Sequence, residues 1–170
     1  MKLVQSSTMI DIGPIVLFTG PHAFLSNFYT DYNRPLTYNG YEFLSAERAY
    51  QAQKAASQDG FTKIQHAATS FHAWKYGHEL ENPAYTPAEW DNVKMDVMEG
   101  VLWAKFQDAE MRELLIGTGD RELVEGTLGS DRFWAEQIVP ANNNDGYVRT
   151  GNGFNYLGQL LMALREGLKP

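Results

Sequence analysis

The sequence predicts an α+β fold in which helices outnumber strands and a small antiparallel sheet opens the chain. Three observations support this prediction. The length of 170 residues suits one domain with one hydrophobic core. Apolar residues recur at helical spacing in several long segments. The pair Asn39-Gly40 lies between short apolar runs and is typical of a type I′ hairpin. We therefore expect a single, mainly helical domain over residues 1–170.

The expected strands are short segments bounded by turn residues. The apolar run from Ile15 to Phe18 predicts the first strand, and Leu36 to Phe43 predicts the hairpin. Two further strands are expected late in the chain, at Leu123-Val124 and around Phe133 to Val139. The polar, glycine-bearing stretch from Ala141 to Gly153 predicts a long loop.

The helices are indicated by capping residues and apolar stripes. Thr86-Pro87-Ala88-Glu89 is a capping box with proline at the first helical position, so we expect a helix from there to about Phe106. Its predicted buried stripe is Trp90, Val93, Val97, Val101 and Ala104. The other expected helices run from Ser45 to about Ala56, between Phe61 and Tyr76, from Asp108 to near Gly117, and from an Asn155 cap through Leu157, Leu160, Leu161, Leu164 and Leu168.

The residue inventory excludes several kinds of chemistry. The chain has no cysteine, which rules out disulfides, thiolate nucleophiles and sulfur-ligated zinc. The four histidines show no metal-ligand spacing, so we expect neither a metal nor a cofactor. No segment approaches the ~20 apolar residues of a membrane span, and residues 1–20 do not resemble a secretory signal. We therefore expect a cytoplasmic protein with no membrane partner.

One predicted helix carries a polar face. Its residues Glu47, Tyr50, Gln51 and Lys54 are spaced so that all four side chains project from the same side. A carboxylate and an amine about two turns apart suit a small ligand, because the carboxylate can manage protons and the amine can bind an anion or attack a carbonyl carbon. The alternative is structural, since glutamate in a first turn stabilises the helix dipole and lysine is ordinary on a solvated face.

Three other segments hold candidate ligand contacts. Asn27, inside an aromatic run, would either cap a turn or donate to a sugar hydroxyl or phosphate. Asp131 and Trp134 follow a glycine turn, and Trp134 would either stack on a base or ribose or pack in the core. Trp90 lies on the expected buried stripe, where its indole N–H hints at a polar neighbour.

Seven motifs occur in an order that resembles the NADAR family, also called YbiA-like proteins, over roughly residues 16–168. The segment from Phe24 to Tyr29 resembles F-x-S-N-F, and the segment from Ser45 to Lys54 resembles S-x-E-H-x-Y-Q-A-x-K. The segment from Trp90 to Met98 resembles W-x-x-x-K/R-x-x-x-M, and Ala104-Lys105-Phe106 follows at the expected distance. Leu123 to Glu125 resembles L-x-E, and Asp131 to Trp134 resembles D-x-x-W. The last segment, Gly153 to Arg165, resembles G-x-N-x-L-G-x-L-L-M-x-x-R. Each motif alone is weak, whereas seven in order are specific.

The resemblance implies a YbiA-like fold and an N-glycosidase acting on ribosylated bases. The implied substrates include phosphoribosylated pyrimidine intermediates of riboflavin synthesis and ADP-ribose attached to guanine. It implies catalytic positions at Glu47, Lys54 and Asp131, with Lys54 at the reactive carbon of the sugar. Together with the residue patterns, it leads us to expect substrate contacts from Asn27, Arg48, Tyr50, Trp90, Trp134 and Asn155.

Two residues depart from the family pattern. Arg48 replaces the usual histidine and would add a phosphate-binding fork, and Ala135 replaces the glycine that normally follows the tryptophan. An enlarged loop from Ala141 to Gly151 also separates that tryptophan from the final motif.

The expected reaction breaks a ribose–nitrogen bond. Positive charge builds on the anomeric carbon while the departing base needs a proton, so a site needs an acid and a stabilising anion together. Glu47 and Asp131 would supply the two carboxylates if they converge on one sugar pocket, and the sequence leaves their roles open. Lys54 would form a transient Schiff base with ring-opened ribose.

The expected partners are ribosylated bases or ADP-ribose. The formal charge of −7 argues against broad binding to phosphate backbones, so any contact with ADP-ribosylated DNA is expected to be local. Two rival interpretations stay open: a non-catalytic ADP-ribose or nucleotide-binding module, and an interaction domain in which these residues only pack.

Overall fold

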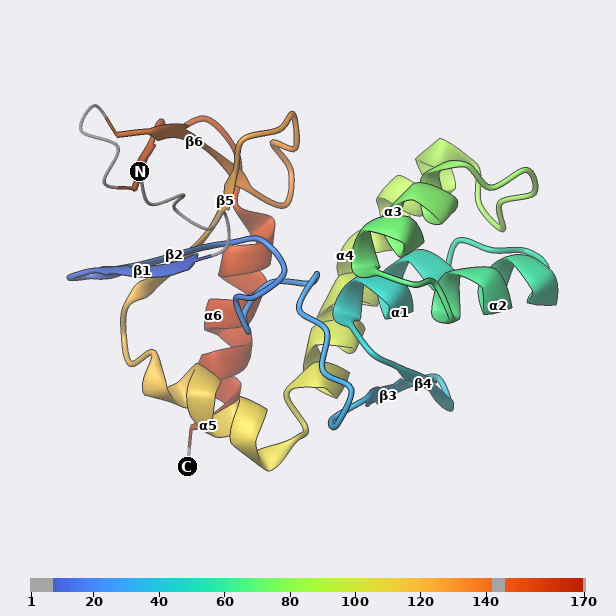
Figure 1. The fold of residues 1–170 in the computed structure, drawn as a ribbon, viewed down its shortest axis with the longest axis horizontal. Helices are drawn as coiled ribbons and strands as arrows, with labels where there is room; N and C mark the ends of the chain where they lie inside the picture. Colours follow the sequence, from blue (N-terminus) through green and yellow to red (C-terminus); the bar gives the residue numbers. More distant parts are fainter. Residues whose placement is uncertain (1–7, 142–145, 170) are drawn as a thin grey trace. The chain divides into compact units, whose positions relative to one another are not determined.

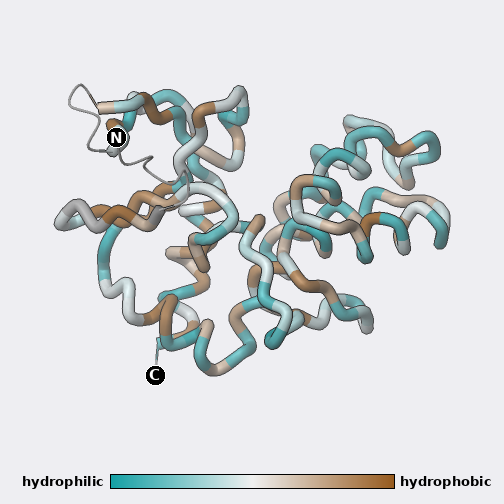
Figure 2. Tube along the Cα trace, in the orientation of Figure 1, coloured by the Kyte–Doolittle hydropathy of each residue, from teal (hydrophilic) through white to brown (hydrophobic). Residues whose placement is uncertain are grey.

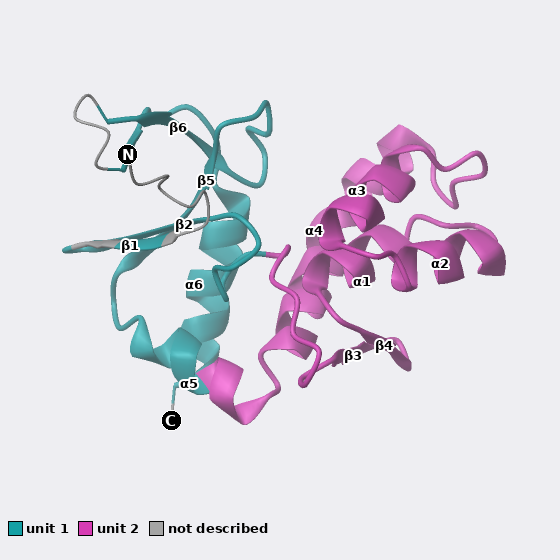
Figure 3. Ribbon diagram, viewed as in Figure 1, with its two compact units in different colours: residues 1–26, 113–170 teal, residues 27–112 magenta. Residues whose placement is uncertain are grey.

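The computed structural model describes residues 8–141 and 146–169. It forms two compact units, one made of residues 1–26 and 113–170 and the other of residues 27–112 (Figures 1 and 3). The organisation as a single domain stays a prediction. Among the described residues, no helix is long and apolar enough to cross a membrane.

The first unit is built on a five-stranded sheet with the order β1-β2-β5-β6-β7. Its central pairs, β2 with β5 and β5 with β6, are parallel, whereas the outer pairs are antiparallel. The strands are β1 (Thr8–Ile12), β2 (Ile15–Thr19), β5 (Glu122–Thr127), β6 (Glu136–Pro140) and β7 (Tyr147–Arg149). The helix α6 (Tyr156–Leu168) belongs to this unit, and α5 (Ala109–Gly117) spans the boundary in sequence between the units.

The core of the first unit lies on the sheet. Leu17, Val124 and Ile138, from three neighbouring strands, are buried against one another. Val16, Leu17 and Phe18 are all buried, as expected for a strand covered on both faces. The hydropathy of the trace shows the same apolar character along β1 and β2 (Figure 2). Burial of this apolar run therefore accounts for the central place of β2.

Asn155 ties α6 to the sheet. Its backbone adopts the left-handed conformation, with φ 51°, which asparagine tolerates. Its Oδ1 accepts a hydrogen bond from the backbone N–H of Glu125 at 3.0 Å, and its Nδ2 donates to the carbonyl of Leu123 at 2.9 Å. Close approach of the helix is possible because Gly158 faces the strand, and a Cβ there would lie 2.1 Å from the Leu123 oxygen. The amide of Asn155 thus completes the hydrogen bonding of β5.

The second unit consists of a hairpin and four helices. The hairpin joins β3 (Leu36–Tyr38) to β4 (Tyr41–Phe43) through Asn39 and Gly40, which have φ of 50° and 81°. This geometry confirms the predicted hairpin turn. The helices are α1 (Ala46–Ala52), α2 (Gln58–Gln65), α3 (Ser70–His78) and α4 (Pro87–Lys105). One cluster of buried residues, including Phe43, Ala49, Ile64 and Ala73, forms the core between them.

The α+β class is confirmed, and the predicted sheet needs correction. The main sheet is five-stranded and mixed, not small and antiparallel. Two strands, β1 and β7, were not predicted. The strand β7 lies within the stretch expected to be a loop, of which residues 142–145 lie outside the described residues. These strands are recognised by their pairing with other segments, which a local pattern does not reveal.

The helix predictions are right in kind and wrong at several boundaries. The Thr86 capping box is present, and α4 ends at Lys105 as expected. The helix predicted between Phe61 and Tyr76 is two helices, because Thr69 caps a new one by accepting from the backbone N–H of His72. The helix expected to reach Ala56 ends at Ala52. Of the predicted stripe on α4 only Val101 is fully buried, and the other buried residues of that helix are Met98, Leu102 and Lys105.

The predicted side-chain cap by Asn155 is wrong. The residue occupies the N-cap position of α6, but its side chain makes no capping hydrogen bond. The amide is used for β5 instead, as described above. The expected substrate contact by Asn155 stays untested, and the observed role of its side chain is structural.

We predict that Asn155→Asp lowers the free energy of unfolding by about 1 to 3 kcal/mol, because a carboxylate cannot donate to the carbonyl of Leu123 and leaves it without that partner. Urea denaturation measures the change. The matched control is Asn92→Asp at an exposed position of α4, which is expected to change stability by less than about 0.5 kcal/mol. Equal stability of the two variants would contradict the role assigned to Asn155.

Candidate active site

The short helix α1 positions most of the predicted site residues. All seven of its residues are buried. Ser45 begins the helix by accepting a hydrogen bond from the backbone N–H of Arg48. The backbone N–H of Glu47 donates to the carbonyl of Asn27 at 2.9 Å, which ties the aromatic segment before the hairpin to the first turn. Hydrogen bonds therefore hold the start of the helix from two sides.

The Glu47 carboxylate is held by Gln51. The side-chain Nε2 of Gln51 donates to Oε1 of Glu47 at 2.8 Å, and both side chains are buried. The spacing of four residues makes this contact one between successive turns of the same helix. A hydrogen bond donated to a carboxylate favours its ionised form. The contact therefore supports an anion at Glu47.

Asn27, whose carbonyl contacts the start of α1, is also buried. Its Nδ2 donates to Sδ of Met98 in α4 at 3.2 Å. Its Oδ1 accepts no hydrogen bond from the described residues, and neither does Oε1 of Gln51. Two of the buried amide oxygens in this unit thus lack protein donors among those residues, which is uncommon in folded proteins.

Lys54 follows α1 in a turn. Its backbone N–H donates to the carbonyl of Gln51 at 3.1 Å, and its carbonyl accepts from the backbone N–H of Ala84 at 2.7 Å. Its amine lies over two aromatic rings, 5.5 Å from the ring centroid of Tyr50 and 5.2 Å from that of Trp90. The two rings meet edge to face with their centroids 5.1 Å apart, and Tyr85 packs against Trp90. The amine therefore lies in an aromatic corner.

The pKa of the Lys54 amine lies below the usual value for lysine. Burial is the main cause, because it disfavours the charged form. The positive charge of Lys94 lowers this pKa further, whereas the negative charge of Glu47 opposes the shift. A lowered pKa gives a larger fraction of neutral amine at a given pH, and only the neutral amine is a nucleophile.

Arg48 has a structural environment. Its guanidinium is buried and donates to four residues: Thr30, Ser45, Ala67 and Ala68. The two carbonyl acceptors lie in the connection between α2 and α3, so the side chain ties that connection to α1. All of its nitrogen atoms are engaged within the chain. This geometry does not support the phosphate-binding fork that we expected for Arg48.

The Asp131 and Trp134 motif shapes a loop of the first unit. Oδ1 of Asp131 accepts hydrogen bonds from the backbone N–H groups of Phe133 and Trp134 at 2.9 and 3.0 Å. Asp131 is exposed and Trp134 is half-buried, with its ring at right angles to that of Phe133. Asp131 and Glu47 belong to different compact units, so their convergence on one sugar stays a prediction.

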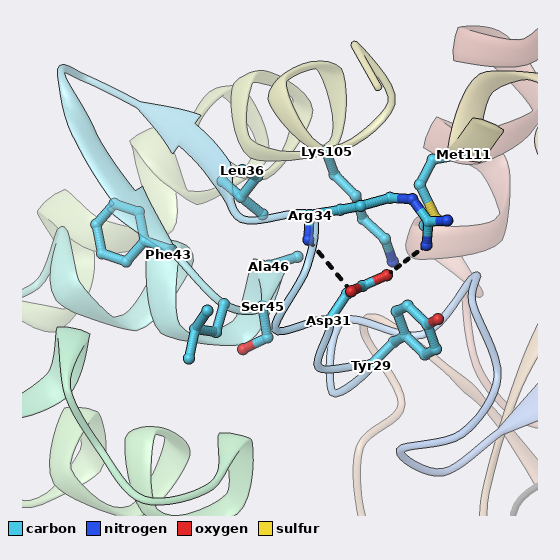
Figure 4. Close-up of a pocket in the computed structure, with 10 residues that line it drawn as sticks. Tyr29, Asp31, Arg34, Leu36, Phe43, Ser45, Ala46, Lys105 and Met111 are labelled. Atoms are coloured by element: carbon cyan, nitrogen blue, oxygen red, sulfur yellow. Dashed lines mark hydrogen bonds and ion pairs between the residues drawn. The ribbon is translucent and has the colours of Figure 1, made fainter. Parts of the chain in front are cut away.

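A separate cavity lies beside the start of α1. Figure 4 shows its lining, which includes Tyr29, Asp31, Arg34 and Lys105. Burial disfavours ionisation of Asp31, but hydrogen bonds from Asn33 and Arg34 outweigh it and hold its pKa below the usual value. The guanidinium of Arg34 donates to the Asp31 carboxylate at 2.9 Å and also contacts Glu110. The lining contains none of the predicted site residues, and two of its charged residues, Asp31 and Arg34, pair with each other.

The structure therefore brings together part of the predicted site. Glu47, Tyr50, Lys54 and Trp90 cluster around α1, as their spacing and the family motifs predicted. The sequence reasoning did not assign a role to Gln51, although its spacing of four residues from Glu47 could have indicated the hydrogen bond. It also missed Tyr85 and Lys94, whose contribution depends on the packing of α4.

The fold and this cluster define an α+β protein in which a buried acid is followed by a half-buried amine that lies over two aromatic rings. The chain belongs to the NADAR domain family, whose model matches residues 17–169. It is 33% identical to the N-glycosidase YbiA of Escherichia coli over 148 residues, which cover 84% of each chain. It is also 33% identical to an N-glycosidase of Nostoc punctiforme over 129 residues, or 74% of each chain.

Two further comparisons support the assignment. The chain is 31% identical to a riboflavin biosynthesis protein of Vibrio vulnificus over 149 residues, which cover 87% of this chain and 36% of that protein. The solution structure of YbiA from Escherichia coli matches with a TM-score of 0.72 at 29% identity and covers 98% of this chain and 93% of that one. The YbiA-like family predicted from the motifs is confirmed.

We predict opposite effects of two substitutions on the pKa of Lys54. Glu47→Gln removes a negative charge and should lower this pKa further, whereas Lys94→Gln removes a positive charge and should raise it. NMR titration of the lysine Cε signals measures both changes, with Lys54→Arg used to assign the signal. Lys75→Gln, at an exposed position of α3, is the control and should leave the Lys54 titration unchanged. Shifts of the same sign in the two test variants would contradict the electrostatic account.

Proposed function

We propose that the chain is an N-glycosidase that hydrolyses the ribose–nitrogen bond of ribosylated bases. The proposed substrates are ADP-ribosyl-guanine and phosphoribosylaminopyrimidine intermediates of riboflavin synthesis. The observation that carries the proposal is the Lys54 amine, which lies against Tyr50 and Trp90 with a lowered pKa, seven residues after the buried Glu47 carboxylate. Relatives described as N-glycosidases and as a riboflavin biosynthesis protein support the reaction class.

The proposed reaction begins at the anomeric carbon. The neutral amine of Lys54 attacks this carbon as its bond to the base nitrogen breaks. Glu47, ionised at the start, faces the positive charge that develops on the sugar. It takes the proton released by the attacking amine and passes it to the departing base. The base leaves protonated, and the sugar is bound to Lys54.

The second half of the reaction releases the sugar. The ribosyl-lysine opens at the ring oxygen to give a Schiff base between the amine and the former anomeric carbon. Water adds to this imine, which restores the free amine and frees the ribose. Asp131 and Trp134 match the D-x-x-W motif of the family, so we propose that Asp131 orients this water and that Trp134 stacks on the base or ribose. The rings of Trp90 and Tyr50 lie against the amine.

The proposal predicts release of free base by the wild-type protein from at least one of the two proposed substrates. Glu47→Gln should lower the turnover number by about 10²- to 10⁴-fold, because the variant can neither carry the proton nor face the sugar with a negative charge. Chromatography of the reaction mixture detects the base. The matched control is Glu99→Gln at an exposed position of α4, which should keep wild-type turnover.

Two outcomes of this experiment would contradict the proposal. Binding of both substrates without release of base would favour the non-catalytic module. Full turnover by Glu47→Gln, with an unchanged melting temperature, would exclude the role given to this carboxylate.

The Schiff base predicts a covalent adduct that can be trapped. Borohydride added during turnover should reduce the imine and leave a ribose-containing mass on the protein, which peptide mass spectrometry should locate at Lys54. Lys54→Arg keeps the positive charge but cannot form an imine, so it should give no adduct. Lys75→Arg, on the exposed face of α3, is the control and should give the wild-type adduct. A fully active wild-type protein that yields no adduct would refute the lysine step.

A further inference from the structure

The contact between α1 and α3 contains two residues that are unfavourable where they stand. Gln51 is buried, and its Oε1 accepts no hydrogen bond from the described residues. Gly77 lies within α3, although glycine weakens a helix. Its φ lies outside the left-handed region and it is not the C-cap of the helix, so backbone conformation does not require glycine. Residues that break local rules tend to mark functional positions.

The contact between Gln51 and Gly77 explains both residues. A Cβ added at Gly77 would lie 2.1 Å from Oε1 of Gln51 and 2.9 Å from its Cβ and Cδ. Glycine at position 77 therefore makes room for the Gln51 side chain, which occupies the space between the two helices. In that position the opposite end of the amide, Nε2, donates to the Glu47 carboxylate at 2.8 Å.

We propose that Gln51 is a positioning residue that holds the Glu47 carboxylate for the reaction, and that Gly77 provides the space that Gln51 needs. This inference rests on the proposed function in one respect only, which is the expected effect of the variants on turnover. The amide donates to Oε1 of Glu47 and so restricts the orientation of the carboxylate. A leucine or methionine at position 51 would fill similar space without an unsatisfied oxygen, so the amide is explained by the hydrogen bond that it donates.

Charges also act near this contact. Lys54, which follows α1, interacts electrostatically with Glu47, and Lys94 of α4 acts on Lys54 in turn. Gly77 of α3 adds no charge at the contact. Gln51 therefore controls Glu47 through a hydrogen bond rather than through a net charge, and a change at position 51 should alter both the geometry and the pKa of Glu47.

The first test replaces the amide. Gln51→Met removes the donor at similar volume, so the turnover number should fall on the order of tenfold to a hundredfold with little change in KM. Gln51→Glu places a second carboxylate beside Glu47, which raises the pKa of the pair. The acid limb of the kcat profile should therefore move to higher pH. Gln58→Met, at an exposed position of α2, is the control and should behave as the wild type.

The second test displaces the amide without changing it. Gly77→Ala should lower the turnover number to a similar extent, because the new methyl group pushes Gln51 away from Glu47. In a Gln51→Ala background the same substitution should cost less turnover, since the Oε1 and Cδ of Gln51 are then absent and only the 2.9 Å contact with the Cβ of residue 51 remains. Gly117→Ala in α5, where an added Cβ meets no atom within 4 Å, is the matched control and should keep full activity.

The two tests have outcomes that separate this inference from the proposed function. Wild-type turnover and pH profiles in stable Gln51→Met and Gly77→Ala variants would overturn the positioning role while leaving the N-glycosidase intact. If the wild type releases no base, carboxyl ¹³C NMR still decides the matter. Gln51→Met and Gly77→Ala should then both raise the pKa of Glu47, and an unchanged titration in either variant would overturn the inference.

Discussion

Complete burial of α1 is the constraint on which the site depends. The helix has seven residues and none of them is exposed, although Glu47, Arg48 and Gln51 carry charged or polar groups. Burying such groups is costly unless each finds a partner. The guanidinium of Arg48 donates hydrogen bonds to Thr30, to Ser45 and to the carbonyls of Ala67 and Ala68. These hydrogen bonds hold the surrounding segments against α1. Glu47 receives the Gln51 amide, and the carboxylate is thereby held in one orientation.

The same constraint explains why Lys54 is suited to covalent chemistry. Just beyond the buried helix, its amine lies against Tyr50 and Trp90, where burial lowers its pKa. The Glu47 charge keeps this shift from being larger, so the amine and the carboxylate influence each other. A site that needs a neutral amine next to an anion obtains both from one short segment of chain. Packing and chemistry are therefore linked within α1.

Local signals in the sequence predicted a large part of the fold. The Thr86 capping box and the Asn39-Gly40 turn act within a few residues, and both appear as expected. The strands β1 and β7 are defined by pairing with remote partners, so no local pattern reveals them. The break between α2 and α3 has a local cause, the Thr69 cap, which the single helix predicted between Phe61 and Tyr76 does not include.

The candidate site was predictable to a different extent. The spacing of Glu47 and Lys54, together with the family motifs, identified the residues that cluster around α1. The role of Arg48 depends on carbonyl groups about twenty residues away, which its own neighbours in sequence do not indicate. For the same reason, the sequence around Gly77 does not indicate that this glycine of α3 borders Gln51. Contacts between helices decided these roles.

The most direct test of the central claim is a crystal structure of Glu47→Gln with a bound phosphoribosylaminopyrimidine or ADP-ribosylated guanine nucleotide. The account predicts that the anomeric carbon lies about 3 to 3.5 Å from Nζ of Lys54, with the side chain at position 47 beside the sugar ring. A sugar bound elsewhere on the protein, with no contact to residue 47 or 54, would contradict it.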